Sequence, residues 1–155
     1  MTRPLGRLTL LVLVLALQAC ASGRRVQPLT GVPSGWPVER SEVVVTAEFG
    51  EPRGRSWHEG IDLAAPAGTP VRVTADGKVL VAEKEGRYGR TVVVDHGGGY
   101  RTRYAHLKKI ETKKGKRVVR GDLIGRVGKS GNASGAHLHY EVLKNGAPVN
   151  PRGFL

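Results

Sequence analysis

The feature that most constrains the fold is a series of short β-type runs, separated by glycine-rich turns, from Ser41 to the C-terminus. The runs are rich in valine, threonine and aromatic residues and cover 42–46, 69–75, 78–83, 91–95, 100–106, 123–127 and 137–143. No stretch has a sustained helical period. Short strands at regular spacing are typical of all-β domains. The sequence therefore predicts antiparallel sheets arranged as a β-sandwich or meander with an open groove.

Three turn signals indicate how neighbouring runs are joined. Asp76-Gly77 is expected to close a β-hairpin between the runs on either side of it. The segment His96–Gly99 is expected to turn the chain in the same way. Asn145-Gly146 is a strong signal for a type I′ turn, which needs positive φ at both central residues. Each of these turns predicts an antiparallel pair of strands.

The pair His137 and His139 lies in the last long run. If this run is a strand, its period of two places both imidazoles on the same face. Two buried imidazoles would need partners for four ring nitrogens, so a hydrophobic core suits them poorly. The pair indicates a metal site or an acid–base pair, and a polar strand face is the alternative.

Two other segments add candidate metal ligands. His58 and Asp62 stand four residues apart, and His106 ends a predicted strand. A hydrolytic zinc site needs three protein ligands and one open position. His58, Asp62 and one histidine of the pair would supply those ligands. The other histidine and His106 would then be free to accept a proton and to stabilise the tetrahedral intermediate.

The residues alone leave two points of this site open. The spacing does not decide which of His137 and His139 binds the metal. The ligand types suit zinc, and copper and manganese are alternatives.

The N-terminal segment has the pattern of a secretory signal. Arg3 and Arg7 precede a mostly apolar run, 8–17, which ends in Gln18-Ala19-Cys20. This arrangement resembles a bacterial lipoprotein signal, which implies removal of residues 1–19 and lipidation of Cys20. Ordinary secretion is the alternative, because Gln18 is larger than the usual residue at its position. Cys20 is the only cysteine, so an intramolecular disulfide is excluded.

The sequence predicts three parts: a signal peptide (1–19), a lipidated Cys20 with a flexible tether (20–40), and one folded domain (41–155). Ala21, directly after the cysteine, favours an outer-membrane lipoprotein facing the periplasm if the host is Gram-negative. The membrane is then a partner through the lipid anchor.

A net charge of +12 indicates attraction to an anionic partner such as nucleic acid, a membrane surface or a cell-wall polymer. No block alternates arginine with aromatic residues, so nucleic-acid binding is not expected. Seven basic residues lie between 108 and 120. A solvated hairpin is the favoured interpretation of this run, and a contact surface for an anionic wall polymer is the alternative.

Four segments, in order, carry a family resemblance: HEGIDLAAPAGTPV, VVVDHGGGYRTRYAHL, VVRGDLIGRVGKSGNASGAHLHYEV and NGAPVNP. Together they cover most of residues 43–151 and resemble the lysostaphin-type (LytM-like) zinc metallopeptidases, which cut peptidoglycan cross-links. The resemblance implies a core like the duplicated hybrid motif. It also implies zinc ligands and catalytic groups at these positions: His58, Asp62 and His139 for zinc, and His106 and His137 for catalysis.

Three further residues receive weaker assignments. Tyr88 resembles a tyrosine that stabilises the oxyanion in some members of the family, and a packed turn tyrosine is the alternative. Glu141 shares the strand face of His139 and could orient a histidine, or it could be an exposed strand carboxylate. His96 is interpreted as structural.

The leading hypothesis is an envelope-anchored zinc endopeptidase that acts on peptidoglycan. The alternative is a non-catalytic LytM-like activator of a cell-wall amidase. Such regulators typically lack metal ligands, whereas the whole set is present here, so catalysis is favoured. A basic wall-binding protein would explain the charge but not the histidines. The sequence identifies no protein partner.

Overall fold

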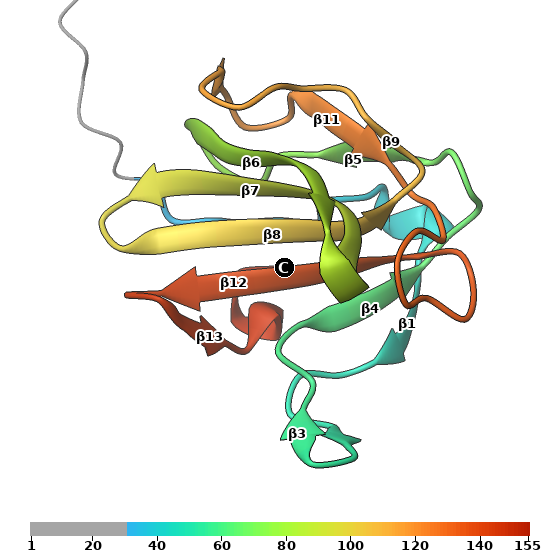
Figure 1. Cartoon of the computed structure of the whole chain (residues 1–155). Helices are drawn as coiled ribbons and strands as arrows, with labels where there is room; N and C mark the ends of the chain where they lie inside the picture. The colour runs from blue at the N-terminus through green and yellow to red at the C-terminus, as the bar shows by residue number, and fades with distance from the viewer. Residues whose placement is uncertain (1–30) are drawn as a thin grey trace, which may run out of the picture.

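The structure is a computed structural model that describes residues 31–155 (Figure 1). The predicted signal peptide, Cys20 and the first part of the predicted tether lie outside these residues. Within the described part of the chain, no helix is long and apolar enough to cross a membrane.

An antiparallel sheet of eight strands forms the centre of the fold. Its strands follow the order β1-β4-β12-β8-β7-β6-β10, and β13 pairs with β12. They are β1 (Val44–Ala47), β4 (Ile61–Ala64), β6 (Gly77–Glu85), β7 (Gly89–Gly97), β8 (Tyr100–Leu107), β10 (Arg117–Val118), β12 (His137–Lys144) and β13 (Ala147–Val149).

A smaller sheet and a separate hairpin complete the fold. The smaller sheet has the order β5-β11-β9, with β5 (Pro70–Arg72), β9 (Lys109–Ile110) and β11 (Leu123–Arg126). The hairpin pairs β2 (Pro52–Arg53) with β3 (Ser56–Trp57). Three 3₁₀ turns are η1 (Arg40–Glu42), η2 (Gly86–Tyr88) and η3 (Pro151–Phe154). The all-β, antiparallel prediction is confirmed.

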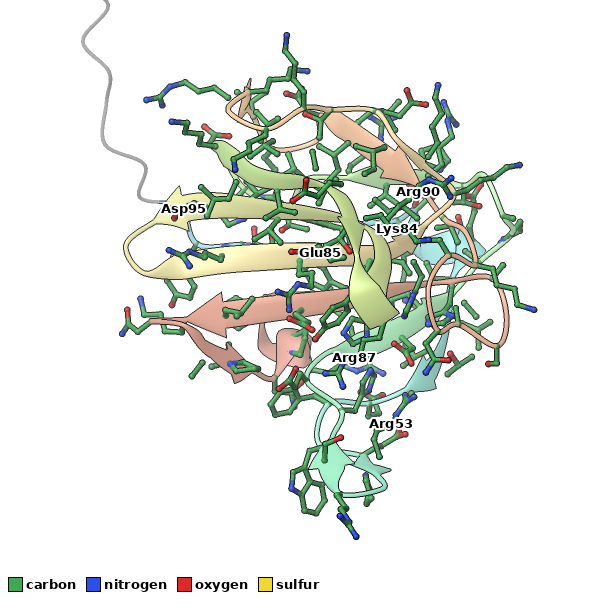
Figure 2. All side chains as sticks on the ribbon, in the orientation of Figure 1. Arg53, Lys84, Glu85, Arg87, Arg90 and Asp95 are labelled. Carbon is green, nitrogen blue, oxygen red and sulfur yellow. The ribbon has the colours of Figure 1, made fainter. Side chains whose placement is uncertain are left out.

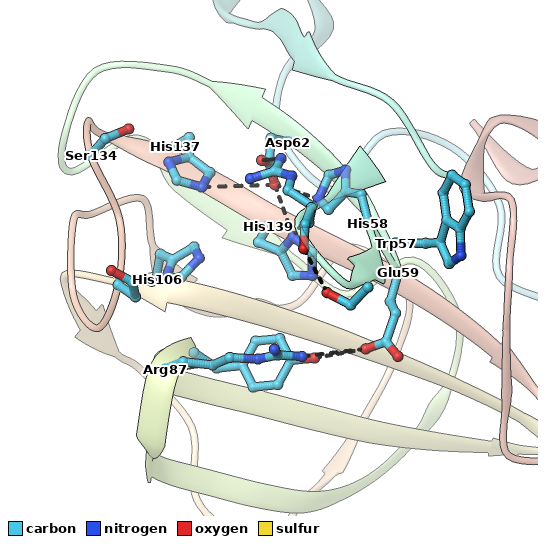
Figure 3. Close-up of a pocket in the computed structure, with 13 residues that line it drawn as sticks. Trp57, His58, Glu59, Asp62, Arg87, His106, Ser134, His137 and His139 are labelled. Atoms are coloured by element: carbon cyan, nitrogen blue, oxygen red, sulfur yellow. Dashed lines mark hydrogen bonds and ion pairs between the residues drawn. The ribbon is translucent and has the colours of Figure 1, made fainter. Parts of the chain in front are cut away.

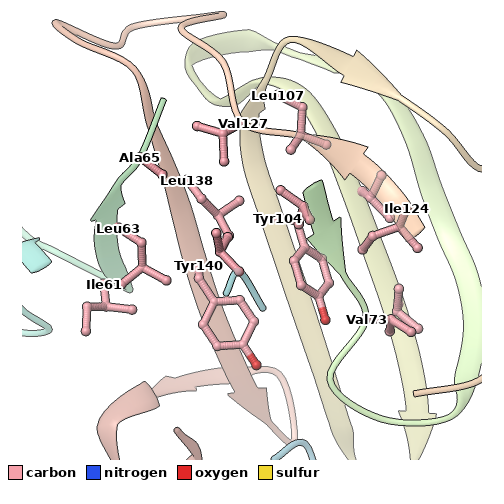
Figure 4. Close-up of a cluster of buried hydrophobic side chains, with 14 of the residues drawn as sticks. Ile61, Leu63, Ala65, Val73, Tyr104, Leu107, Ile124, Val127, Leu138 and Tyr140 are labelled. Carbon is pink, nitrogen blue, oxygen red and sulfur yellow. The ribbon is translucent and has the colours of Figure 1, made fainter. Parts of the chain in front are cut away.

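The hydrophobic core lies between the two sheets (Figure 4). Leu138 and Tyr140 of β12 are fully buried and pack in one cluster with Ile124 of β11. Because side chains alternate along a strand, the opposite face of β12 is left for His137 and His139. The core therefore fixes which face of the central sheet can carry a polar site.

A network of buried polar groups crosses this core. His96 in β7 is fully buried, with Nδ1 2.8 Å from the Asp76 carbonyl oxygen and Nε2 2.7 Å from Thr102 Oγ1. Thr102 Oγ1 lies 3.0 Å from the Tyr104 hydroxyl. Burial lowers the pKa of His96. The neutral ring donates from Nδ1 to Asp76 and accepts at Nε2 from Thr102, which agrees with a structural role.

The hairpin predicted at Asp76-Gly77 is wrong. β5 pairs with β11, whereas β6 pairs with β7 and β10, so the runs on either side of Asp76 belong to different sheets. The Asp76 carboxylate instead accepts a hydrogen bond from the backbone N–H of Arg120. A turn dipeptide permits a reversal locally, but burial of Val71 in the other sheet decides the pairing.

The turn predicted at Asn145-Gly146 is present. Asn145 has φ 52° and Gly146 has φ 84°, the two positive values that a type I′ turn requires. The turn joins β12 to β13 in an antiparallel pair.

Residues 31–40, which the sequence placed in the flexible tether, lie against the domain. The backbone N–H of Gly31 donates to the His96 carbonyl oxygen at 3.0 Å, and that of Ser34 donates to the Thr74 carbonyl oxygen at 3.0 Å. Val38 is buried in the core, and Trp36 packs against it. These apolar side chains extend the folded domain toward the N-terminus, so its predicted start at 41 is too late.

Candidate active site

Neighbouring strands place Asp62 and His139 side by side. In the antiparallel pair β4–β12, His139 stands directly opposite Asp62, and His137 stands opposite Ala64. Directly opposed residues on one face have Cβ atoms about 5 Å apart. The strand register therefore brings together two side chains that are 77 residues apart in the sequence.

His58 reaches the same place from the loop before β4. A side chain at Gly60 would clash with the backbone oxygen of Tyr140, so only glycine lets this loop lie directly on β12. His58 Nδ1 donates to the Glu48 carbonyl oxygen at 2.7 Å. That bond leaves His58 Nε2 as the unprotonated nitrogen of the neutral ring.

Three ligand-type atoms converge: His58 Nε2, Asp62 Oδ1 and His139 Nδ1. The two histidine nitrogens lie 3.0 and 2.8 Å from Asp62 Oδ1, respectively, and 3.0 Å from each other (Figure 3). His139 Nε2 lies 3.0 Å from Glu141 Oε1 and donates to it. With both rings neutral, the cluster has three lone-pair atoms facing one another and no proton donor among them.

This donor set fits a metal ion. Ligand atoms on tetrahedral zinc, with bonds of about 2.0–2.1 Å, are separated by roughly 3.3 Å, close to the spacing seen here. The group His58, Asp62 and His139 is a potential metal-holding cluster of buried residues. His137 lies at its edge, with Nε2 3.7 Å from Asp62 Oδ1. The geometry therefore groups His139, rather than His137, with the other two ligands.

Asp62 is held in its ionised form. Burial acts to raise its pKa, but the His139 and His58 rings beside Oδ1 outweigh burial and hold the pKa of Asp62 well below its usual range. Its second oxygen, Oδ2, accepts a hydrogen bond from Arg53 Nη2 at 2.8 Å. The carboxylate thus turns one oxygen to the cluster and the other to Arg53.

A β-bulge aims His106 at this cluster. Arg90 pairs with Leu107 and Val92 with Tyr104, so Thr91 alone faces both Ala105 and His106. His106 also has φ 61°, a left-handed value that is uncommon outside glycine. Without the bulge, alternation would point His106 into the core beside Tyr104.

His106 and His137 form a second pair beside the cluster, with ring centroids 4.7 Å apart. Nδ1 of His106 donates to the Ser130 carbonyl oxygen at 2.8 Å, and Nδ1 of His137 donates to that of Gly135 at 3.0 Å. Burial lowers the pKa of His106, which favours its neutral form. In the neutral rings, Nε2 is the nitrogen that can accept a proton.

The sequence matches Peptidase family M23 over residues 56–151, which include all five of these residues. The chain belongs to peptidase family M23. The family resemblance stated from the sequence motifs is thereby confirmed.

Relatives of this M23 chain are named as DD-carboxypeptidases and peptidoglycan DD-endopeptidases. The DD-carboxypeptidase/endopeptidase Mpg of Neisseria meningitidis is 45% identical over 112 residues, which are 69% of this chain and 26% of that protein. The peptidoglycan DD-endopeptidase ShyA of Vibrio cholerae is 48% identical over 93 residues, 60% of this chain and 22% of that protein. The chain spans about a quarter of the length of these curated relatives.

Solved structures show the same fold. A zinc-containing peptidase from Vibrio cholerae superposes with a TM-score of 0.71 at 39% identity, over 76% of this chain and 38% of that chain. The catalytic domain of lysostaphin from Staphylococcus simulans gives a TM-score of 0.67 at 28% identity, over 72% of this chain and 91% of that chain.

The candidate oxyanion residue, Tyr88, lies beside His139 in the M23 site, on η2. Its hydroxyl donates to Glu59 Oε2 at 3.1 Å, and its ring centroid lies 5.7 Å from that of His139. Burial raises the pKa of Tyr88, so the hydroxyl stays protonated at neutral pH. Tyr88 thus places a hydroxyl donor in the groove, and in this structure that hydroxyl donates to Glu59.

The M23 site opens into a groove of about 330 Å³. Asn132 and Ser134, from the glycine-rich loop before β12, are among its lining residues. The other lining residues are Arg53, Ser56, Trp57, His58, Glu59, Asp62, Arg87, Tyr88, His106, His137 and His139.

Sequence reasoning gave no role to the two arginines of this groove. Arg53 and Arg87 belong to no periodic or motif pattern that would mark them, since both lie in short turn-rich segments. Only the packing of the β2–β3 hairpin and of η2 around the cluster brings them to the site.

Proposed function

We propose that this M23 chain is a zinc metalloendopeptidase that hydrolyses the peptide cross-links of bacterial peptidoglycan. The observation that carries the proposal is the convergence of three lone-pair atoms, from His58, Asp62 and His139, at the floor of an open groove. The names of the relatives, which include peptidoglycan DD-endopeptidases, support the choice of substrate.

His58, Asp62 and His139 would hold the zinc ion. Bound there, zinc supplies a Lewis acid for the scissile carbonyl and lowers the pKa of a bound water to about 7. The two imidazoles already have the tautomers that this role requires. His58 donates from Nδ1 to the backbone carbonyl of Glu48, and His139 donates from Nε2 to the carboxylate of Glu141.

His106 and His137 would move the protons. Each has Nδ1 bound to a backbone carbonyl oxygen, so each can accept a proton at Nε2 from the attacking water. Once protonated, the same Nε2–H can donate to the developing charge on the scissile carbonyl oxygen or to the leaving amine. Tyr88 could add a hydroxyl donor if substrate displaces its bond to Glu59.

The protein would act at the cell envelope. The signal pattern before Cys20 supports removal of residues 1–19 and a lipid anchor on Cys20, and Ala21 supports the outer membrane, facing the periplasm, if the host is Gram-negative. Replacing Cys20 with serine should move the protein from the membrane fraction to the soluble periplasmic fraction. Membrane retention of Cys20→Ser would contradict the anchor.

A muropeptide digest tests the activity. The full chain, purified in detergent and loaded with zinc, is incubated with peptidoglycan beside the His139→Ala variant, and the products are separated by mass. Loss of cross-linked dimers with the wild type alone would support the endopeptidase. Unchanged peptidoglycan with both proteins would overturn it and favour the alternative, a non-catalytic activator of a cell-wall amidase.

A further inference from the structure

Two arginines line the groove and have no part in the proposed hydrolysis. Arg53 lies on the β2–β3 hairpin, and Arg87 lies on η2 (Figure 2). Their side chains are 47% and 67% exposed, respectively, so both guanidinium groups can meet a ligand from solvent. Cationic side chains beside a peptide-cleaving centre point to an anionic group on the substrate.

Arg53 is anchored next to the catalytic cluster. Its Nη2 donates to Asp62 Oδ2 at 2.8 Å, while Oδ1 of the same carboxylate meets the histidines. A guanidinium group has five N–H donors in a fixed plane. The bond to Asp62 uses one of them and fixes the position of the group, which leaves further donors for a second carboxylate.

The charge of Arg53 is only partly neutralised. Within residues 31–155, Asp62 is the one carboxylate within 4.0 Å of the Arg53 guanidinium nitrogens. The same Asp62 is also a candidate metal ligand and a partner of two histidines. Arg53 therefore keeps N–H donors, and part of its charge, available for a second carboxylate.

Arg87 is held more loosely. Its Nη2 lies 3.8 Å from Glu59 Oε2, and its guanidinium carbon lies 5.3 Å from the centre of the Tyr88 ring. A contact at 3.8 Å is too long for a hydrogen bond. Arg87 can therefore reorient toward a bound anion at little cost.

Arg53 lies where the α-carboxyl group of the residue after the scissile bond would come in a bound peptide substrate. The α-carboxyl carbon of the residue after the scissile amide is three bonds from the scissile carbonyl carbon, roughly 3–4 Å away given standard backbone dimensions. It is a carboxylate when that residue forms no further amide bond through it. A scissile carbonyl placed over the cluster would put such a carboxylate within reach of the guanidinium bound to Asp62. Arginine pairs with carboxylates through two parallel hydrogen bonds.

We infer that Arg53, assisted by Arg87, binds a free α-carboxylate on the residue that follows the scissile bond. The site would then select cross-links in which that residue carries a free carboxylate, and it would reject the corresponding carboxamide. This inference rests on the proposed endopeptidase function and assigns its specificity to two residues.

The test compares two synthetic cross-linked peptides that differ only in this group, one an acid and one an amide. The full chain in detergent, loaded with zinc, should cleave the acid about 10–100-fold faster in kcat/KM, the range for one charged hydrogen-bonded contact. Arg53→Gln should reduce this ratio to near one, mainly through KM for the acid, and Arg87→Gln should reduce it partly. Arg55→Gln, an exposed arginine on the same hairpin outside the groove lining, should keep the wild-type ratio.

The acid-to-amide ratio of kcat/KM distinguishes a loss of carboxylate recognition from damage to the zinc site, because a loss of zinc would slow the cleavage of both peptides alike. The zinc content of Arg53→Gln is measured in parallel. Equal cleavage of acid and amide by the wild type would overturn the inference and leave the proposed function standing. A ratio that stays at the wild-type value in both groove variants would overturn the inference as well.

A binding experiment distinguishes the two proposals. Uncleavable acid and amide analogues are titrated calorimetrically into the metal-free full chain. Preference for the acid, lost in Arg53→Gln, would support the carboxylate site even if the zinc-loaded chain cleaved neither peptide, an outcome that would overturn only the function. Absence of any preference in binding and in cleavage would overturn the carboxylate site.

Discussion

Glu141 lies fully buried behind His139, with Oε1 3.0 Å from the His139 Nε2 nitrogen. Its other oxygen accepts a hydrogen bond from Arg103 Nη1 at 2.7 Å. Burial acts to raise the pKa of Glu141, but the hydrogen bond from His139 and the charge of Arg103 outweigh burial and lower it. An ionised Glu141 holds the proton of His139 on Nε2, so that Nδ1 faces the metal cluster.

Replacing Glu141 with glutamine should therefore weaken metal binding. A partner of this kind typically contributes about 10–100-fold in metal affinity. Zinc affinity is measured by competition with a chromophoric chelator. Glu111→Gln is the matched control, since Glu111 pairs with Lys109 and Arg126 away from the groove. Equal zinc affinity in wild type and Glu141→Gln would contradict the role of Glu141.

Removing the metal should lower the thermal stability of the wild type. A ligand that binds only the folded chain stabilises it by about 4 kcal/mol when its concentration is 1,000 times Kd. Differential scanning fluorimetry with zinc and then with a chelator measures the change in Tm. The shift should disappear in Asp62→Ala, which lacks the shared ligand oxygen. A wild-type Tm unaffected by chelation would argue against a metal site.

Replacing His106 with asparagine should abolish most activity while leaving the fold intact. Asparagine tolerates the positive φ of this bulge position but cannot accept a proton as imidazole does. Loss of a general base is expected to reduce kcat about 10²–10⁴-fold. Zinc content and Tm, measured on the same samples, should stay close to wild type. Near-normal cleavage of muropeptides by His106→Asn would exclude His106 as the base.

His96 should make the metal-free domain less stable in mild acid. Burial lowers its folded pKa below the unfolded value of about 6.5, so below that pH the unfolded chain binds a proton that the folded chain does not. Stability contributed by neutral His96 is complete above pH 6.5 and falls by up to about 1.4 kcal/mol per pH unit below it.

Urea denaturation of the metal-free chain at pH 7.5 and 5.0 measures this dependence. His96→Asn, though less stable overall, should show a smaller loss of unfolding free energy between the two pH values. An identical loss in both proteins would show that other groups control the acid sensitivity.

Much of the candidate site could be predicted because its chemistry is carried by recognisable residue types. The His-x-His step of β12 needs only strand alternation to place His137 and His139 on one face, and the structure has them there. The choice of His139 as the residue grouped with His58 and Asp62 came from the family resemblance, since spacing treats the two histidines alike. The actual grouping follows from the register of β12 against β4.

The pairing of distant strands was less predictable. The turn at Asn145-Gly146 was predicted correctly because a type I′ turn is encoded by two adjacent residues. The turn at Asp76-Gly77 was not, because the strands beside it find their partners in different sheets, through burial of side chains far apart in the sequence.

The sequence by itself determined the all-β class, the catalytic residue types and their family, because these depend on local periodicity and on motifs a few residues long. The tertiary structure decided what depends on register and packing. The bulge at Ala105-His106 turns His106 out of the core face, and the packing of the β2–β3 hairpin brings Arg53 to Asp62. Strand alternation alone would have pointed His106 into the hydrophobic core beside Tyr104, and no local pattern joins an arginine in a turn to a carboxylate on another strand.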